Sequence, residues 1–147
     1  MITWICKPFA ALSVDELYAI IQLRSEVFVV EQNCVFLDAD NKDQSSFHLM
    51  GWRDERLVAY TRLVPPGIAY EEASIGRVVT SITARGSGIG RELMQHSIDE
   101  CRKLFGEGVI KIGAQLYLKA FYSSLGFVPI GGIYPEDGID HIHMLLS

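Results

Sequence analysis

The segment of the chain best suited to bind an anion is a run of alternating glycines flanked by arginines, from Arg85 to Arg91. Gly86, Gly88 and Gly90 follow a β-branched segment and precede an amphipathic one. Glycines let a backbone approach a ligand closely, and a helix N-terminus presents unpaired N–H groups with a favourable dipole. Between a strand and a helix, this pattern fits a phosphate or a pyrophosphate. The alternative is a turn whose glycines serve only close packing.

Two common phosphate-binding loops do not match this run. A P-loop requires a lysine directly after its last glycine, and no lysine follows here. A dinucleotide-binding fingerprint requires Gly-x-Gly-x-x-Gly, but Arg91 stands where its third glycine would be. The run therefore belongs to neither of these two loop types, and the packing alternative stays open.

The acidic and histidine pairs of the sequence do not indicate metal binding. Asp38-x-Asp40 resembles the start of a calcium loop, but Lys42 stands where an oxygen ligand would be needed. His141-x-His143 places two imidazoles on one face of a strand, with no third ligand nearby in the sequence. We therefore expect no metal site.

The segments that must position these residues alternate between strands and helices. Seven segments have the composition or the alternation of strands. They cover residues 2–6, 48–53, 57–64, 74–81, 109–114, 127–130 and 141–146. The most polar stretch, Asp38–Ser46, is typical of a surface loop.

Three segments carry helical signals. Ser13 and Glu16 form a capping-box pattern, and apolar residues recur at helical spacing over residues 17–28. An amphipathic helix is predicted over residues 89–105, and a short helix over residues 117–125. The resulting order, β-α-β-β-β-α-β-α-β-β, predicts an α/β fold in which helices flank a mixed β-sheet.

Length and composition fit one globular domain spanning residues 1–147. The hydrophobic fraction of 49% excludes disorder, and a chain of this size can bury a core without disulfides. A net charge of −5 argues against a nucleic-acid partner, which would favour a basic face. Three widely spaced cysteines suit reduced thiols, and neither a signal peptide nor a membrane-length apolar run occurs, so we expect a cytoplasmic protein without a membrane partner.

Two motifs together resemble the GNAT superfamily of N-acetyltransferases. Arg85-x-x-Gly88-x-Gly90 is similar to the acyl-CoA loop of that superfamily. The segment 115–127, in which a Phe-Tyr pair precedes Gly-Phe, resembles its late helix. Further likeness to the ElaA branch is carried by residues 22–24, 27–34, 75–78 and 137–142. The resemblance runs over nearly the whole chain and implies a single-domain, GNAT-like fold.

The resemblance implies acetyl-CoA as co-substrate. Backbone groups of one strand would pair with the pantetheine arm, and amides of the glycine run would hold the pyrophosphate. Gln115 stands where many members have an asparagine that contacts the cofactor. The implied cofactor-binding residues are Val78, Val79, Thr80, Arg85, Gly86, Ser87, Gly88, Ile89, Gly90, Arg91 and Gln115.

Tyr122 is the general acid that the resemblance implies. A phenol can protonate a departing thiolate when it lies within hydrogen-bond reach, and a backbone N–H near Val79 would polarise the thioester carbonyl. The structural alternative for Tyr122 is a core aromatic, because Leu118 and Leu125 share its helix face. The two roles are compatible.

The general base is not assigned by the sequence. Some members of the superfamily place a glutamate at the position that is Ile110 here. The remaining candidates are Glu31, Glu72, His48 and His141, or a chain of water molecules.

The sequence also does not determine which residues bind the acceptor. Arg77 points opposite to Val78 along the strand, so it either faces the acceptor and favours a substrate carboxylate, or pairs with an acid such as Glu26. Glu31, His48 and Arg77 are the candidate substrate residues.

The sequence thus predicts an N-acetyltransferase that moves an acetyl group from acetyl-CoA to a primary amine, on a small molecule or a peptide, by direct transfer through a ternary complex. Two alternatives remain: a CoA-binding regulatory module without turnover, and a transferase that uses a different acyl donor. The net negative charge of the chain would attract cationic amines through long-range electrostatics. The protein is expected to be a monomer or a homodimer.

Overall fold

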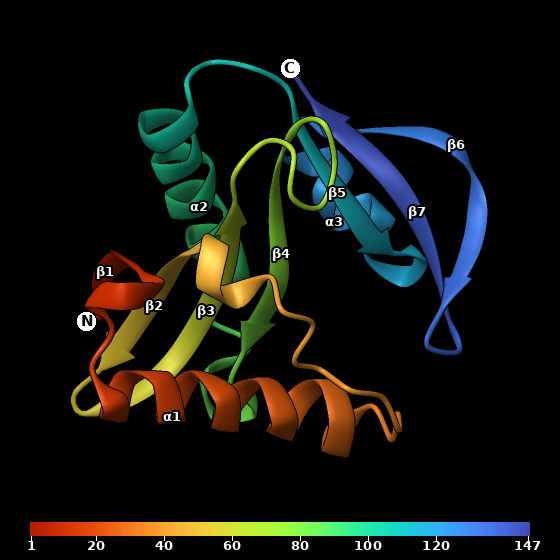
Figure 1. Cartoon of the computed structure of the whole chain (residues 1–147). Helices are drawn as coiled ribbons and strands as arrows, with labels where there is room; N and C mark the ends of the chain where they lie inside the picture. Colours follow the sequence, from red (N-terminus) through yellow and green to blue (C-terminus); the bar gives the residue numbers. More distant parts are fainter.

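The computed structural model describes residues 1–147 and contains one seven-stranded sheet, in the order β1-β2-β3-β4-β5-β7-β6 (Figure 1). All neighbouring strands are antiparallel except β4 and β5, which are parallel. The predicted mixed sheet is confirmed. Its strands are β1 (Thr3–Pro8), β2 (Phe47–Arg53), β3 (Arg56–Val64), β4 (Ala73–Thr80), β5 (Ile110–Gln115), β6 (Val128–Glu136) and β7 (Ile139–Leu146).

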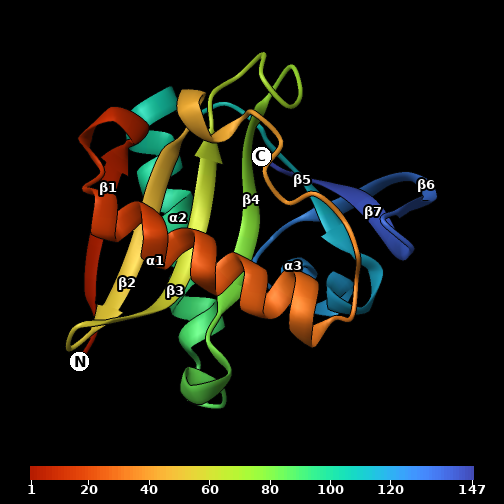
Figure 2. The ribbon, with the colours of Figure 1, turned by 60° about the horizontal axis from the view of Figure 1, so that its bottom comes forward.

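Three α-helices cover the sheet: α1 (Val14–Arg24), α2 (Ile89–Phe105) and α3 (Lys119–Ser124). The predicted capping box of α1 is present, since Ser13 and Glu16 exchange side-chain and backbone hydrogen bonds. In Figure 2, α1 crosses in front of the sheet while α2 lies behind it. Short 3-10 turns occur at η1 (Phe9–Ala11), η3 (Asp43–Ser45), η4 (Ile82–Ala84) and η5 (Leu116–Leu118).

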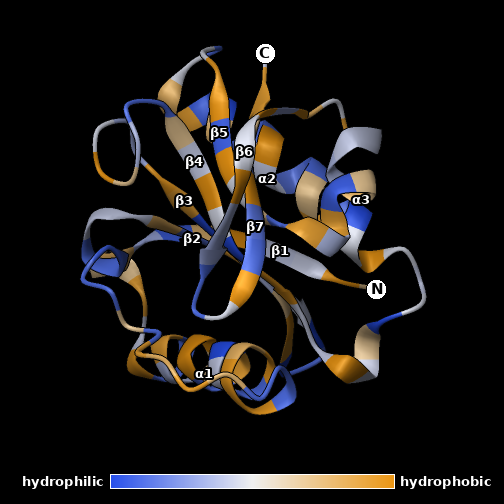
Figure 3. Ribbon diagram, turned by 90° about the vertical axis from the view of Figure 1, so that its right-hand side faces the viewer, coloured by the Kyte–Doolittle hydropathy of each residue, from blue (hydrophilic) through white to orange (hydrophobic).

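The core is divided between the two faces of the sheet. Apolar residues of α1 pack with those of β2, β3 and β4 on one face, while α2 packs against the other face. The largest cluster joins α2 and α3 to β4, β5 and β7. Every residue of β3 except Arg56 is buried, because the strand is covered on both faces. Figure 3 shows hydrophobic residues along these inner strands.

The helix after Ser13 is longer than predicted and changes pitch. Beyond Arg24 the chain continues as a π-helix, η2 (Ser25–Glu31). Such turns are rare and often occur at functional sites. Here the π-turn carries Val27 and Phe28 to the lining of the cleft described below.

The polar stretch predicted as a surface loop, Asp38–Ser46, does lie at the surface, but three of its acidic side chains reach inward. Asp43 accepts hydrogen bonds from Arg24 (2.7 Å) and Arg62 (2.9 Å), whose side chains are almost fully buried. Asp38 also pairs with Arg24, at 2.8 Å, and Asp40 pairs with Arg62, at 2.7 Å. We call Arg24, Arg62, Asp38, Asp40 and Asp43 the Arg–Asp network. Polar composition predicted exposure, but the buried guanidiniums require carboxylate partners.

The last hairpin is longer than predicted. The strand expected to end at Ile130 continues to Glu136, with a register shift between Ile130 and Tyr134. Asp137 and Gly138 connect it to β7, and both have positive φ (51° and 78°). This is the backbone of a two-residue hairpin turn, for which Asp-Gly is a preferred sequence.

The sheet splits between β4 and β5. The two strands pair only at Ala73–Ile110 and Ser74–Lys111, and residues 75–80 of β4 have no partner on that edge. A bulge in β4 accompanies the split: Arg77 has φ of 49°, and the register with β3 shifts there. Bulges bend a strand and increase its twist, so the bulge favours divergence of β4 from β5.

No helix of the structure has both the length and the apolar character needed to cross a bilayer.

Candidate active site

A cleft of about 450 Å³ lies where β4 and β5 diverge. Residues 75–80 of β4 form one wall, and Ile112, Gly113 and Gln115 of β5 contribute to the other. The π-turn and the chain after it, α3, and the β6–β7 turn complete the lining. The cleft is therefore built at the break in the sheet, with backbone groups of one strand exposed to it.

The predicted phosphate loop borders this cleft, and its residues Arg85 and Gly90 belong to the lining. The backbone N–H groups of residues 86–91 donate no hydrogen bond within the chain, and the first helical bond runs from Glu92 N–H to Gly88 O (3.1 Å). Gly86 and Gly88 have φ of 92° and 78°, and a Cβ at either would meet no atom within 4 Å. Free amides at the start of a 17-residue helix fit an anionic group such as a pyrophosphate.

Arg85 and Glu31 form a bidentate ion pair beside this loop. The two guanidinium nitrogens of Arg85 donate to the carboxylate of Glu31 at 2.6 and 2.8 Å, and one also donates to the carbonyl oxygen of Thr80 at 3.1 Å. The hydrogen bonds from Arg85 hold the pKa of Glu31 below its ordinary value. Glu31 is therefore ionised and bound to Arg85. It does not line the cleft.

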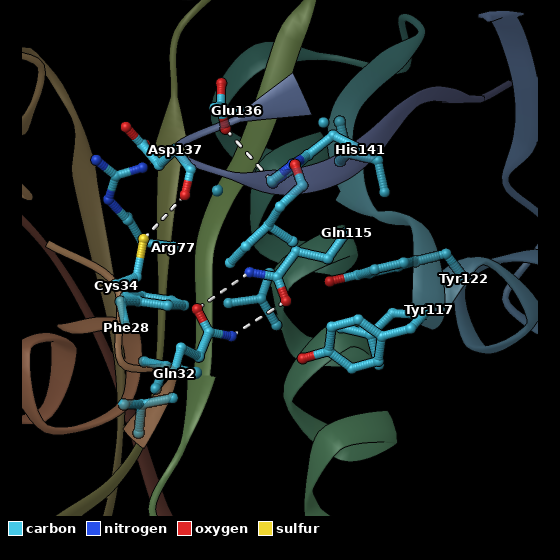
Figure 4. Close-up of a pocket in the computed structure, with 18 of the residues that line it drawn as sticks. Phe28, Gln32, Cys34, Arg77, Gln115, Tyr117, Tyr122, Glu136, Asp137 and His141 are labelled. Carbon is cyan, nitrogen blue, oxygen red and sulfur yellow. Dashed lines mark hydrogen bonds and ion pairs between the residues drawn. The ribbon is translucent and has the colours of Figure 1, made fainter. Parts of the chain in front are cut away.

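Tyr122 lies in the wall of the cleft and is 5% exposed. Its ring packs edge-on against Phe121 and Phe127, with centroids 5.2 and 6.0 Å apart, and its hydroxyl points toward the cleft (Figure 4). Burial, with a smaller contribution from Tyr117, raises the pKa of Tyr122 well above that of a free phenol. The core role and the proton-donor role predicted for Tyr122 are thus both compatible with its position.

Gln115 faces Gln32 across the cleft. The two side-chain amides exchange hydrogen bonds at 3.2 and 3.4 Å (Figure 4). Nearby, the Cys34 thiol donates to the carbonyl oxygen of Asp137 at 3.0 Å. Residues 32–34 thereby link the α1 side of the cleft to β5 and to the β6–β7 turn.

His141 is the candidate base that the structure brings into the cleft. It is 6% exposed, with Nδ1 at 2.7 Å from the carbonyl oxygen of Ile139 and Nε2 at 3.4 Å from the carboxylate of Glu136. The Glu136 side chain is 56% exposed, so this carboxylate lies at the solvent edge of the cleft.

Arg77 lines the cleft but is paired within the protein. Its Nε lies 2.8 Å from Asp38, and a terminal nitrogen lies 3.3 Å from Asp40. Arg77 thus reaches the cleft, as the first alternative for this residue predicted. It also pairs with acids, as the second predicted, but these are Asp38 and Asp40 of the Arg–Asp network and not Glu26.

Besides Glu31, two sequence candidates lie outside the cleft lining. His48 is fully buried, with Nδ1 at 2.6 Å from the Tyr60 hydroxyl and Nε2 at 2.9 Å from the carbonyl oxygen of Asp43. Burial lowers the pKa of His48, and both of its nitrogens are used inside the core. Glu72 borders a separate hollow near the end of α2. Neither residue is placed to meet an acceptor in the cleft.

Several cleft residues were not singled out by sequence reasoning. They are Phe28, Gln32, Phe36, Tyr117, Glu136, Asp137 and Ile139. The Asp137-Gly138 dipeptide could have predicted the hairpin that carries Glu136, because Asp-Gly is a preferred sequence for a two-residue hairpin turn. The inward turn of residues 32–36 depends on tertiary contacts and leaves no local pattern. No group of three or more His, Cys, Asp or Glu side chains is arranged to hold a metal ion.

The split sheet, the free amides before α2 and the buried phenol together define an acyl-CoA-dependent acyltransferase of the GNAT type. Residues 16–147 match the acetyltransferase (GNAT) domain family, and the chain belongs to it. Protein ElaA of Escherichia coli (strain K12) is 42% identical over 146 residues, which are 98% of this chain and 95% of ElaA.

Solved structures agree with this assignment. The crystal structure of an acyl-CoA N-acyltransferase from Pseudomonas aeruginosa matches with a TM-score of 0.96 at 42% identity, covering 100% of both chains. The crystal structure of Escherichia coli ElaA matches with a TM-score of 0.93 at 40% identity, again over 100% of both chains. The predicted GNAT-like fold and the likeness to the ElaA branch are confirmed.

Proposed function

We propose that this protein transfers the acetyl group of acetyl-CoA directly to a primary amine, within a ternary complex. The observation that carries the proposal is the continuity of one surface. The unpaired edge of β4, residues 75–80, leads to the free amides of residues 86–91, with the Tyr122 phenol in the wall of the same cleft. When bound, acetyl-CoA would supply the acetyl group as a thioester.

The residues of the chain fit this co-substrate by type and by position. The unpaired edge at Val78, Val79 and Thr80 offers backbone donors and acceptors to an amide-containing arm, as an added strand would. The loop amides offer donors to a diphosphate. Gln115, engaged with Gln32, would exchange that bond to contact a ligand.

Tyr122 supplies the proton of the reaction in this proposal. Because burial raises its pKa, the phenol stays protonated at neutral pH and its Oη can give a proton to a departing sulfur. The thiol in the cleft lining, Cys34, is hydrogen-bonded to Asp137 O and has no base among its hydrogen-bond partners. This supports direct transfer over a covalent acyl-enzyme.

A binding assay followed by a turnover assay tests the proposal. Acetyl-CoA should raise the melting temperature, and thiol release should then depend on an added amine from a panel of alkylamines, polyamines, amino acids and short peptides. Binding without release for every amine would instead indicate the regulatory module. Faster release from a longer acyl-CoA than from acetyl-CoA would indicate a different donor.

A further inference from the structure

The two ring nitrogens of His141 have different surroundings. The partner of Nδ1 is the carbonyl oxygen of Ile139, at 2.7 Å, which can only accept a hydrogen bond. Nδ1 therefore carries the hydrogen, and in the neutral ring Nε2 bears the lone pair. That lone pair lies 3.4 Å from a carboxylate oxygen of Glu136, and both residues line the cleft (Figure 4).

When the His141 ring is neutral, this arrangement sets two hydrogen-bond acceptors side by side without a donor between them; in a protonated ring, Nε2–H would donate to Glu136. A ligand that carries several N–H groups and a positive charge satisfies both acceptors at once. A primary ammonium has three such donors on one nitrogen. A carboxylate or an alcohol ligand would leave at least one of the two acceptors unsatisfied.

The other charged groups at this end of the cleft favour the same ligand. Arg77 is neutralised by Asp38 and Asp40, so it offers little net positive charge to the cleft. Glu136 and Asp137 are both exposed at the β6–β7 turn. The local charge is therefore negative, which attracts an ammonium and repels a carboxylate.

Other titratable groups of β5, β6 and β7 pack beside the His141 ring. Tyr134 of β6 lies beside the ring, with centroids 5.7 Å apart, and stacks more closely on His143, at 4.4 Å. Tyr70 packs edge-on against His143, and Lys111 of β5 lies over the Tyr70 ring. These groups contact one another, and Glu136 is the charged partner of Nε2.

We propose that His141 and Glu136 form the site that binds the acceptor ammonium and removes its proton; this inference rests on the proposed function. Glu136 holds the ammonium. His141 Nε2 gains the proton as one N–H bond breaks, and the freed nitrogen lone pair forms the bond to the acyl carbon. Tyr122 gives its proton to the leaving sulfur and regains one from the new amide nitrogen. His141 then releases its proton to solvent, and the Glu136 carboxylate stabilises the intervening imidazolium.

Imidazole nitrogen NMR tests the binding half of this proposal without turnover. His141 is expected in the Nδ1–H tautomer, and n-butylammonium should shift its Nε2 resonance saturably, whereas n-butanol should not. Glu136→Gln should remove the ammonium response, and since the Glu136 side chain is largely exposed, this variant is expected to fold. An Nε2–H tautomer, or equal responses to the amine and the alcohol, would overturn the proposal.

Chemical rescue tests the proton-transfer half. His141→Ala should lose about 100-fold in amine-dependent turnover while retaining acetyl-CoA binding, and added imidazole should restore activity in a concentration-dependent manner. His143→Ala, on the same strand face but outside the cleft lining, is the matched control and should need no rescue. Full activity of His141→Ala, or a loss that imidazole does not restore in a folded variant, would overturn the base role. Lack of wild-type turnover with every amine would contradict the proposed function instead, and the NMR titration would still decide whether the pair binds an ammonium.

Discussion

Tyr122 joins the core and the cleft in one side chain. Its ring lies between Phe121 and Phe127, while its hydroxyl reaches the cleft. Burial disfavours the phenolate, so the pKa of Tyr122 is raised and the proton is kept until a stronger base is generated beside it. A departing thiolate is such a base when it lies within hydrogen-bond reach. The same burial that stabilises the fold thus prepares the residue as an acid.

Replacement of Tyr122 by phenylalanine separates these two roles. Tyr122→Phe keeps the ring packing and removes only the hydroxyl, so we expect a melting temperature close to that of the wild type. Turnover measured as thiol release should fall by about 100-fold, the usual contribution of a general acid. Leu125→Ala at the C-cap of α3 serves as a packing control, which should lower stability more than turnover. Wild-type turnover in Tyr122→Phe would exclude the acid role.

The pH profile offers an independent check on Tyr122. Its pKa is raised above the reference value of about 10 for a free phenol. The acid therefore remains protonated across the whole neutral and mildly alkaline range. With a saturating amine, the turnover of the wild type should show no alkaline decline below about pH 10, provided that circular dichroism shows the protein still folded. A decline centred near pH 8 would contradict this assignment.

At the scale of elements, the N-terminus of α2 is built for an external anion. Gly88 is its N-cap residue in a left-handed conformation and offers no side-chain cap, so the first-turn amides stay free. A serine or an aspartate would cap the helix better but would occupy the space in front of these amides. Helix α2 thus has no side-chain cap at its N-terminus, and its first-turn N–H groups remain available to a ligand.

Alanine at Gly88 should therefore weaken both folding and binding. The positive φ of 78° makes a Cβ strained, at a cost of about 1 kcal/mol. Gly106, at the other end of α2, also has positive φ (91°) and open space around it, but it lies away from the cleft. The backbone of Gly106 (φ 91°, ψ −178°) lies in a region that is essentially restricted to glycine, so Gly106→Ala should lose at least as much stability in urea unfolding as Gly88→Ala while binding acetyl-CoA normally. Equal binding by the two variants would contradict the role of the loop.

The Arg–Asp network fixes the loop before β2 against the sheet. Burial alone would raise the pKa of Asp43, but hydrogen bonds and ion pairs with Arg24 and Arg62 outweigh it and lower the pKa. A carboxylate with a lowered pKa contributes stability above its unfolded pKa, and this contribution is lost as the pH falls toward the folded value. Asp40 behaves in the same way through Arg62. The free energy of unfolding should thus decline below about pH 5.

Asp43→Asn removes one carboxylate from this network. Arg24 and Arg62 are 2% and 4% exposed, so loss of a partner leaves buried charge less well compensated. We expect a loss of about 3 kcal/mol in the free energy of unfolding at pH 7, measured with urea. The difference from the wild type should shrink at pH 3, because the corresponding carboxyl groups of the unfolded wild-type chain become protonated there and the stabilisation by the ionised folded carboxylates is reduced. A constant difference at both pH values would refute the electrostatic origin.

How far the sequence predicts the fold depends on the range of the interactions. The helices and inner strands follow local signals, such as the Ser13–Glu16 capping box and the apolar face of residues 89–105. The phosphate loop is also local, since its glycines are contiguous. The π-turn, the inward Arg–Asp network and the Gln32–Gln115 contact depend on residues distant in the chain, and no local pattern encodes them.

At the scale of the whole molecule, the functional feature is a break in an otherwise continuous sheet. Strands β1–β4 carry α1 and α2, while β5, β6 and β7 carry α3. Between the two parts, strand pairing is limited to two β4–β5 residue pairs. The largest core cluster, which includes α2, packs across both parts, and contacts from Gln32 and Cys34 cross the opening. A ligand bound along the unpaired edge of β4 would replace strand contacts that the fold omits.

Ligand binding should accordingly stabilise the whole chain. At a concentration of 100 times its Kd, acetyl-CoA is expected to add about 2.7 kcal/mol to the free energy of unfolding. For a domain of this size, that corresponds to a rise of roughly 5–10 °C in melting temperature. A scan with and without the ligand measures it, and adenosine, which lacks the pyrophosphate, is the matched control. Equal shifts from both compounds would argue against pyrophosphate recognition by residues 86–91.

The most direct test of acetyl transfer is the stoichiometry of its products. Mass spectrometry of a reaction containing acetyl-CoA and the best amine of the panel should find free CoA and N-acetyl amine in equal amounts, each requiring both substrates, with no acetylated protein. Release of CoA without the amide, or an acetylated form of the protein that accumulates before the amide, would contradict direct transfer to a primary amine.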